Sequence, residues 1–157
     1  MKKPNQEIKV IAQNKKAYYE YFIEEEVEAG IVLVGNEVKS LRFCHPNISE
    51  SYADNIQGDI YIIGLNIPEY KNSMKFFQYH PKRKRKILLH KREIKRLIGL
   101  KERKGYTLVP LKLYFNKRNI AKVSLGIAKG KKKYDKRYVI KQREWDREKA
   151  RASKNFE

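Results

Sequence analysis

The sequence contains little of the chemistry that metal centres and disulfides require. Its single cysteine, Cys44, cannot form a disulfide or a cysteine-rich zinc site within the chain, and this composition fits a reducing compartment. The three histidines, His45, His80 and His90, show neither HxH nor HxxxH spacing. We therefore expect no metal site and no cofactor.

Long apolar runs are missing as well. Residues 1–7 are followed by no apolar segment of a signal peptide, and nowhere do about 18 apolar residues run together. A basic helix with a thick Leu and Phe face, which would bind a membrane surface, is also absent from the pattern. We expect a cytoplasmic protein that does not contact membranes.

Acidic residues are scarce in the second half of the chain. Residues 1–81 hold 9 basic and 11 acidic residues, a net charge of −2, whereas residues 82–157 hold 28 and 7, a net charge of +21. All of the excess positive charge of the chain, +19 in total, therefore lies in the second half. A basic surface of this size implies a polyanionic partner. With 11 Tyr, 6 Phe and 1 Trp available for base stacking, a nucleic acid is favoured over a membrane.

Patterns typical of enzymes are weak. Cys44 and His45 are adjacent, which points their side chains apart on a helix or strand and disfavours a nucleophile–base pair. The string from Gly126 to Lys131 has three residues between its glycines instead of the four of a phosphate-binding loop, and no Ser or Thr follows. We expect a protein that is not an enzyme.

The first half of the chain predicts strands and one short helix. The run from Tyr18 to Val34 is rich in Tyr, Ile and Val and predicts one or two strands. Asn36 is a candidate cap for a helix over 37–43, with Val38 and Leu41 facing inward and Lys39 and Arg42 outward. Residues 51–56 and 60–67 flank Gln57-Gly58-Asp59 and predict a hairpin.

An acidic cluster interrupts the first of these strands at Glu24, Glu25, Glu26 and Glu28. These carboxylates are either outward-facing solvated positions or a set that binds a metal ion or accepts hydrogen bonds from RNA. The second interpretation keeps open a metal-dependent nuclease that uses Glu24, Glu26 and Glu28 as an alternative function.

The second half predicts one helix and two long strands. Residues 68–80 predict a mobile loop, and the five consecutive basic residues 82–86 are typical of a solvated segment, although they lead directly into an apolar run at 87–89. Ile94, Leu97 and Ile98 give a helical period over 91–104, which Gly105 ends. Apolar and polar residues alternate in two strands over 106–127, so each strand has one apolar face. In the first strand this face holds Thr107, Val109, Leu111, Leu113 and Phe115, and in the second Ala121, Val123, Leu125 and Ile127.

Five to seven short strands with two inserted helices predict a mainly β fold, a small closed barrel of the oligonucleotide-binding type with two or three helices. Pro110 lacks a ladder donor and is therefore expected at an edge or a bulge. The barrel domain is expected over residues 1–130.

Residues 131–157 form a basic C-terminal tail, which we expect to be helical or conditionally folded. On a helix, Tyr134, Tyr138 and Trp145 fall within roughly 40° of one another and make a narrow aromatic stripe. A helix that docks on its own domain shows three or four apolar positions in every two turns, and this stripe is narrower. The tail is therefore built to meet a partner with many negative charges.

Several strings occur in a characteristic order along the chain: Asn14-Lys-Lys-Ala17, Tyr21-Phe-Ile-Glu-Glu-Glu-Val-Glu-Ala-Gly30, Gly35-Asn-Glu-Val-Lys-Ser-Leu-Arg42, Lys86-Ile-Leu-Leu-His-Lys-Arg-Glu93, Lys104-Gly-Tyr-Thr-Leu-Val-Pro-Leu-Lys-Leu-Tyr114, Gly126-Ile-Ala-Lys-Gly-Lys-Lys132 and Asp135-Lys-Arg137. Taken together, they resemble the small protein B family, the SsrA-binding (tmRNA-binding) proteins of bacteria. The resemblance covers almost the whole chain from about Ile8 onward.

The resemblance implies a function in trans-translation. The barrel would grip the tRNA-like domain of tmRNA and accompany it into the empty A site of a stalled ribosome, as a monomer and within an elongation-factor-delivered alanyl-tmRNA complex. The tail would become helical in the vacant mRNA channel and contact the decoding centre and its rRNA. A generic ribosomal or initiation-type RNA-binding barrel remains an alternative.

The resemblance also implies the RNA-binding residues. For tmRNA they are Tyr19, Glu28, Lys39, Arg42, Leu88 and His90. For the ribosome they are Lys131, Lys132, Lys133, Tyr134, Asp135, Lys136, Arg137 and Trp145. Many family members have His where this chain has Tyr19, so stacking is retained there but a charge is not. Ala152 and Ser153 replace the bulky apolar residues of some tails, which predicts weaker anchoring of the far end.

Overall fold

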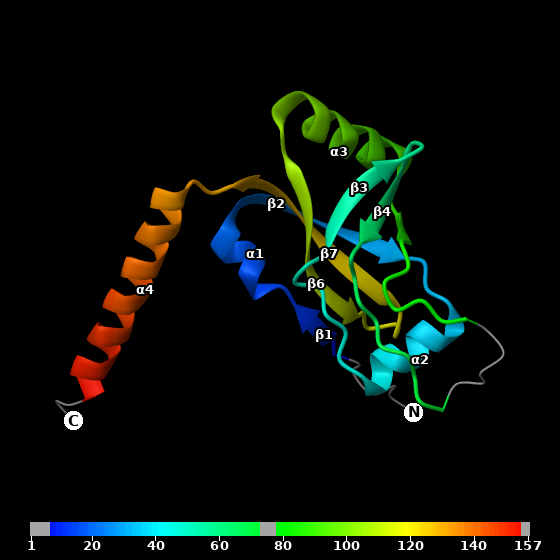
Figure 1. Ribbon diagram of the computed structural model, residues 1–157, viewed down its shortest axis with the longest axis horizontal. Helices are drawn as coiled ribbons and strands as arrows, with labels where there is room; N and C mark the ends of the chain where they lie inside the picture. Colours follow the sequence, from blue (N-terminus) through cyan, green and yellow to red (C-terminus); the bar gives the residue numbers. More distant parts are fainter. Residues whose placement is uncertain (1–6, 73–77, 155–157) are drawn as a thin grey trace.

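The computed structural model describes residues 7–72 and 78–154, which fold into a barrel with a projecting helix (Figure 1). The strands are β1 (Lys9–Gln13), β2 (Tyr21–Ile31), β3 (Tyr52–Ile56), β4 (Asp59–Ile63), β5 (Arg85–Leu88), β6 (Thr107–Phe115) and β7 (Ala121–Gly130). The helices are α1 (Lys15–Glu20), α2 (Gly35–Phe43), α3 (Lys91–Lys104) and α4 (Lys133–Lys154).

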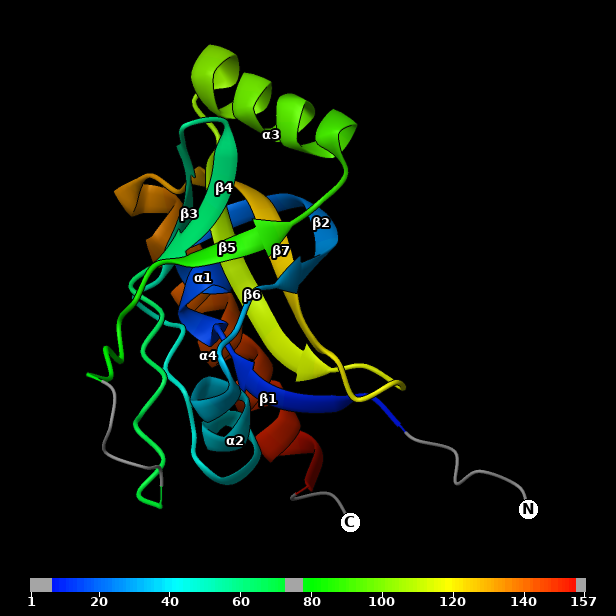
Figure 2. The same ribbon diagram turned by 90° about the vertical axis from the view of Figure 1, so that its right-hand side faces the viewer.

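The sheet closes on itself. Its strand order is β1-β6-β3-β4-β5-β2-β7, and β7 pairs in turn with β6, so six antiparallel strands form a ring and β1 extends beside β6 (Figure 2). Closure removes the free strand edges that an open sheet of this size would expose. The predicted mainly β barrel with helices is therefore confirmed.

β6 and β7 are more deeply buried than their predicted alternation implies. Ala121, Val123, Leu125 and Ile127 do share the face toward the main core. In β6, however, a bulge between Pro110 and Lys112 breaks the alternation. Val109 and Leu111 pack in a second cluster with Ala17 of α1, whereas Leu108, Leu113 and Phe115 pack in the main core. The single-face prediction for β6 was wrong, and the bulge predicted at Pro110 is the reason.

α1 replaces the start of the strand that was expected from Tyr18. Asn14 caps this helix: its side chain accepts a hydrogen bond of 3.1 Å from the Ala17 N–H. The same side chain donates to the Pro110 carbonyl at 3.0 Å, and Asn14 is almost fully buried. Because one amide group both caps α1 and ties it to β6, the helix is fixed against the barrel, and β2 begins only at Tyr21.

α2 begins two residues before its predicted start, at Gly35, and Val34 rather than Asn36 occupies the cap position. Its buried residues are Glu37, Ser40 and Leu41, whereas Val38 is only half-buried. The inward position predicted for Leu41 is confirmed, and the one predicted for Val38 is not. A buried carboxylate on this face was not expected from the hydrophobic pattern.

The hairpin and α3 follow the prediction closely. β3 and β4 are joined at Gln57 and Gly58, both with positive φ (51° and 86°), which is the geometry of a primed two-residue turn. α3 ends at Gly105 in the left-handed conformation (φ 67°). Leu97 is fully buried, and Leu100 with Ile94 completes the packing against the core, where Ile98 had been expected.

The basic run 82–86 is only partly solvated. Arg85 opens β5 and is fully buried, which corrects the expectation of a solvated segment. The loop predicted over 68–80 lies partly outside the described residues, and its described parts contain no helix or strand.

α4 leaves the barrel after Gly130 and projects away from it (Figure 1). Every residue from Lys141 to Lys154 is exposed. The helix therefore adds nothing to the barrel core through these residues.

Candidate nucleic-acid interface

A shallow hollow of about 430 Å³ lies where the end of β2 meets β5 and the start of α3. It brings together three of the predicted RNA-binding residues, Glu28, Leu88 and His90, from three separate elements. The other lining residues are Gly30, Leu89, Glu93 and Lys122.

Leu88 is displayed on the surface by the register of β2 and β5. Gly30 lies opposite Leu88, and a Cβ at Gly30 would stand only 3.2 Å from the Leu88 Cβ. The missing side chain gives Leu88 room while leaving 54% of its surface exposed. An exposed leucine beside polar groups can pack against the apolar face of a base or sugar.

Glu28 is held by a buried tyrosine. The Tyr114 hydroxyl donates a hydrogen bond to Glu28 Oε2, and burial together with this bond raises the pKa of Tyr114 well above its usual value. Tyr114 therefore remains a donor at any physiological pH. The oriented carboxylate repels phosphates, and it can accept hydrogen bonds from base N–H groups or a 2′-hydroxyl.

His90 and Lys122 complete the hollow from opposite sides. His90 is the cap residue of α3, and its backbone N–H donates to Glu93 Oε2 at 3.2 Å, which fixes the start of the helix. Lys122 lies across from Gly30 on one neighbouring strand and from Tyr114 on the other. The sequence prediction missed Lys122, although its place between the inward-facing Ala121 and Val123 marks it as outward-facing.

Lys39 and Arg42 are exposed on α2, outside the hollow. The buried face of α2 is held in place by a network of ion pairs. Glu37 accepts hydrogen bonds from Arg83 at 2.9 and 3.0 Å, and its Oε2 lies 3.2 Å from Arg85 Nε. The network joins α2 to β5 and so sets where the two cations are presented.

The ionisation of Glu37 reflects this network. Burial alone raises the pKa of the Glu37 carboxyl, but the hydrogen bond from Arg83 and the positive charges of both arginines outweigh it and lower the pKa below its usual value. Arg85 also donates to the carbonyls of Leu65 at 2.6 Å and Pro81 at 2.9 Å. Glu37 is thus a charged structural residue at the buried contact between α2 and β5.

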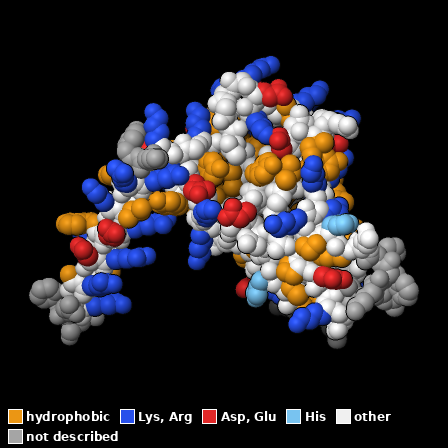
Figure 3. Space-filling model, viewed as in Figure 1, with side chains coloured by type: hydrophobic (Ala, Val, Ile, Leu, Met, Phe, Trp, Pro, Cys, Tyr) orange, Lys and Arg blue, Asp and Glu red, His pale blue; other side chains and the backbone are white. Residues whose placement is uncertain are grey.

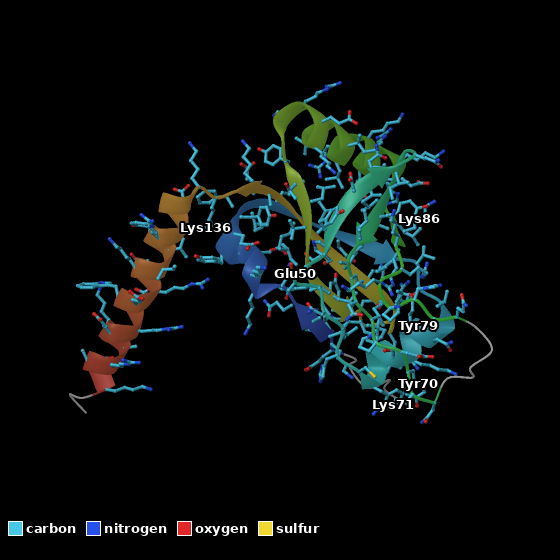
Figure 4. All side chains as sticks on the ribbon, viewed as in Figure 1. Glu50, Tyr70, Lys71, Tyr79, Lys86 and Lys136 are labelled. Atoms are coloured by element: carbon cyan, nitrogen blue, oxygen red, sulfur yellow. The ribbon has the colours of Figure 1, made fainter. Side chains whose placement is uncertain are left out.

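Tyr19 lies elsewhere. It is half-buried on α1, which packs on β6 through Ala17. In Figure 4, Lys86 of β5 lies on the right of the barrel, whereas α1 lies on the side nearer to α4. The structure does not place Tyr19 in the hollow with Glu28 and Leu88. The residues predicted to contact tmRNA are therefore divided between the hollow, α2 and α1.

The root of the tail is anchored to the α1 side. The Lys131 N–H donates to the Glu20 carbonyl at 2.9 Å, and Lys131 Nζ donates to the Tyr18 carbonyl at 3.1 Å while lying 5.0 Å from the centre of the Phe22 ring. Lys132 donates its N–H to Asp135 at 3.2 Å, which closes the first turn of α4. Lys131 and Asp135 therefore also have structural roles.

Most of the described side chains in the rest of the tail face solvent. Lys136 is half-buried, Arg137 is exposed, and Trp145 exposes 56% of its surface beneath the Lys149 ammonium. The side chains of Lys133 and Tyr134 lie outside the described residues. Lys and Arg side chains cover the length of α4 and spread over the visible face of the barrel (Figure 3). Such a surface suits phosphate contacts.

Each carboxylate of the acidic cluster has a different partner. Glu25 forms a two-pronged ion pair with Arg96 at 2.8 Å, Glu26 accepts from Tyr18 and Ser124 at 3.0 Å, and the Tyr106 hydroxyl donates to Glu24. Within residues 7–72 and 78–154, no three His, Cys, Asp or Glu side chains gather closely enough to hold a metal ion. This arrangement does not favour a shared metal between Glu24, Glu26 and Glu28.

None of the helices in the described part of the chain has the length and apolar character needed to cross a bilayer.

The sequence of this chain was compared with family models and with known proteins, and the matches agree on one family. The family model described as SmpB protein matches residues 11–155. A protein named SsrA-binding protein from Bradyrhizobium diazoefficiens is 54% identical over 144 residues, which cover 92% of this chain and 91% of that protein. One of the same name from Wolbachia pipientis is 53% identical over 148 residues, covering 94% and 99%.

A solved structure is similar too. It is described as "tmRNA-SmpB: a journey to the center of the bacterial ribosome", shares 48% sequence identity and superposes with a TM-score of 0.64. The match covers 78% of this chain and 85% of that chain.

Proposed function

This chain belongs to the SmpB protein family, and we propose on that basis that it binds tmRNA and acts with it on the ribosome in trans-translation. The observation that carries the proposal is the hollow in which Glu28, Leu88 and His90 meet. A carboxylate acceptor, an apolar side chain and an imidazole at one site match the donors, bases and sugars of a folded RNA, and Lys122 in the same lining matches its phosphates.

We infer a division of labour between the parts of the chain. The barrel, residues 1–130, binds the tRNA-like domain through the hollow, Lys39, Arg42 and Tyr19. The tail, residues 131–157, enters the vacant mRNA channel, where its basic side chains and Trp145 contact rRNA. Support comes from the exposure of α4, whose charges and aromatic rings meet no core of their own.

Further parts of the proposal follow from a ribosomal site of action. The protein acts as an RNA-binding factor without an enzymatic step, as a monomer, and it joins the ribosome together with alanyl-tmRNA delivered by an elongation factor. Because translating ribosomes occupy the cytoplasm, we place it there.

The experiment that tests the proposal is a binding series with tmRNA and with an rRNA fragment of similar length. We expect tight, selective binding to tmRNA. Log affinity should fall against log salt with a slope of about −3 or steeper, because Lys39, Arg42 and Lys122 would each release roughly one counterion. Equal affinity for the two RNAs would favour a generic ribosomal RNA-binding barrel, and a flat salt series would contradict RNA binding through phosphates.

Glu28→Gln sharpens this test. The change removes the charge and keeps the shape of the side chain, so it should weaken tmRNA binding about 10-fold or more, because hydrogen bonds to a charged acceptor contribute about 1.5–3 kcal/mol. Glu144→Gln on the exposed face of α4 is the matched control and should leave tmRNA affinity unchanged.

A further inference from the structure

Phe43, the last residue of α2, is displayed on the surface. It exposes 71% of its surface, more than Tyr138 or Trp145 of the tail. One face of its ring stacks on Tyr70, with the ring centroids 5.4 Å apart and the planes at 25°. The high remaining exposure means that the outer face of the Phe43 ring is open to solvent.

The segment 67–70, which carries Tyr70, is hydrogen-bonded to two other parts of the chain. The Ser40 hydroxyl on α2 donates to the Pro68 carbonyl, and the Tyr79 hydroxyl donates to the Ile67 carbonyl at 2.8 Å. Ser40 and Ile67 are themselves fully buried. Tyr70 is therefore carried by a segment that is hydrogen-bonded to the helix bearing Phe43, which brings the two rings together.

Cations surround the stack. Lys39 lies one helical turn before Phe43 on the same side of α2, and Lys71 directly follows Tyr70; both are exposed. Arg42 adds a third exposed cation, and Glu69 supplies the neighbouring negative charge, which leaves a positive balance. Figure 4 shows Tyr70 and Lys71 beside α2, at the foot of the side of the barrel that carries Lys86 of β5.

We propose that the outer face of Phe43 stacks on an unpaired base of the bound tmRNA, while Lys39 and Lys71 contact the phosphates that flank this base. The inference rests on the proposed function and extends the RNA surface from the hollow along α2. An aromatic ring framed by cations is the arrangement that binds single-stranded nucleotides, since every base has a π face.

A protein partner fits this surface less well. A stable protein interface buries about 800 Å² on each side, whereas a single phenylalanine ring offers at most about 250 Å². The cations around the ring would also have to be desolvated against an apolar partner. One nucleotide, in contrast, matches both the size of the ring and the charge around it.

The test combines affinity and spectroscopy on the full chain with tmRNA. Phe43→Ala should weaken binding about 5- to 100-fold without changing the salt slope, because it removes stacking and no phosphate contact. Phe43→Trp should bind like the wild type, and Phe43→Leu should resemble Phe43→Ala. Lys39→Ala and Lys71→Ala should each reduce the salt slope by about one.

A fluorescence measurement reports stacking directly. Trp145 is the only tryptophan of the chain, so the double variant Phe43→Trp with Trp145→Phe carries its single tryptophan at the proposed site. Addition of tmRNA should quench its emission. Ile120→Ala is the matched control, since it removes a half-exposed apolar side chain beside Lys117 and Arg118 and should leave affinity unchanged.

The outcomes separate this inference from the proposed function. If the wild type fails to bind tmRNA, the proposed function itself fails. If the wild type binds tmRNA while Phe43→Ala binds equally well and the tryptophan is not quenched, the stacking site alone is overturned. If Phe43→Leu binds with wild-type affinity, the contact is apolar and the proposal of stacking is overturned. Equal losses of affinity in Phe43→Ala and Ile120→Ala would overturn it as well, because the effect would not be specific to Phe43. Unchanged thermal unfolding of each variant excludes misfolding.

Discussion

The barrel and α4 are both rich in charge, but they place it in opposite environments. In the barrel, Glu37 and Arg85 are buried together, and Glu25 pairs with Arg96 across two elements. In α4, 9 basic residues face 4 acidic ones, and none of the ion pairs in the described part of the chain involves this helix. Charge stabilises the fold of the barrel, whereas in α4 it remains available to a partner.

The difference has a physical basis. Like charges on one helix repel one another, and a helix whose residues from Lys141 to Lys154 are all exposed gains little stability from tertiary packing in water. A bound polyanion would relieve the repulsion, so we expect binding to stabilise α4. The barrel needs no such help, because its core is closed and its buried charges are already paired.

The largest expected effect comes from deleting residues 131–157. Tagging of peptides on stalled ribosomes should be abolished, because the part of the chain proposed to enter the mRNA channel is gone. tmRNA affinity should fall far less, since the hollow and α2 remain intact. The measurements are a tagging assay with stalled ribosomes and a binding series with tmRNA.

Thermal unfolding provides the control for this deletion. The barrel should nearly keep its melting temperature, because the residues from Lys141 to Lys154 are exposed and contribute no core contacts. The deletion also removes the surface contacts of Lys131 with Tyr18, Glu20 and Phe22. Parallel loss of tagging and of tmRNA binding would contradict the division between barrel and tail.

The next largest effect is expected for Glu37→Gln, which should lower the free energy of unfolding by about 3–5 kcal/mol. The substitution keeps the shape of the side chain but leaves the fully buried Arg85 without its counter-charge. Denaturant unfolding measures the change. Glu144→Gln on α4 is the matched control and should change stability by less than about 0.5 kcal/mol; similar losses in both variants would refute the contrast.

The pH dependence of stability gives a second measurement on the same variant. The folded-state pKa of Glu37 lies below its usual value of 4.5, so the unfolded state binds more protons between these two pKa values. The contribution of Glu37 is therefore present above about pH 4.5 and is lost as the pH falls through the folded-state pKa. The stability difference between the wild type and Glu37→Gln should shrink in acid; a pH-independent difference would contradict the ionic origin.

The smallest effect is expected for Trp145→Ala. Its ring is exposed and lies against Lys149 rather than any barrel residue, so the free energy of unfolding should change by less than about 0.5 kcal/mol. Leu97→Ala in the core is the matched comparison and should cost about 2–5 kcal/mol. A destabilisation of the Trp145→Ala variant above 1 kcal/mol would show that α4 docks on the barrel in solution.

Most of the local structure was readable from the sequence, because it depends on neighbours in the chain. The hairpin turn at Gln57-Gly58, the end of α3 at Gly105 and the inward face of β7 follow from turn chemistry and hydrophobic period. The family resemblance supplied the candidate RNA-binding residues. Local patterns failed at α1, where a single buried asparagine makes a contact across 96 residues that favours helix over strand.

The sequence by itself determined the closed β architecture, the concentration of charge in the second half and the narrow aromatic stripe of the tail, because alternation, composition and helical spacing are properties of the chain. Only the tertiary structure decided which charges are structural and which are displayed. Arg85 stands in a run of five basic residues, yet β5 turns it inward against Glu37, while Phe43 ends an ordinary amphipathic helix and is left exposed on Tyr70. Such outcomes depend on strand register and packing between distant segments, which no local pattern encodes.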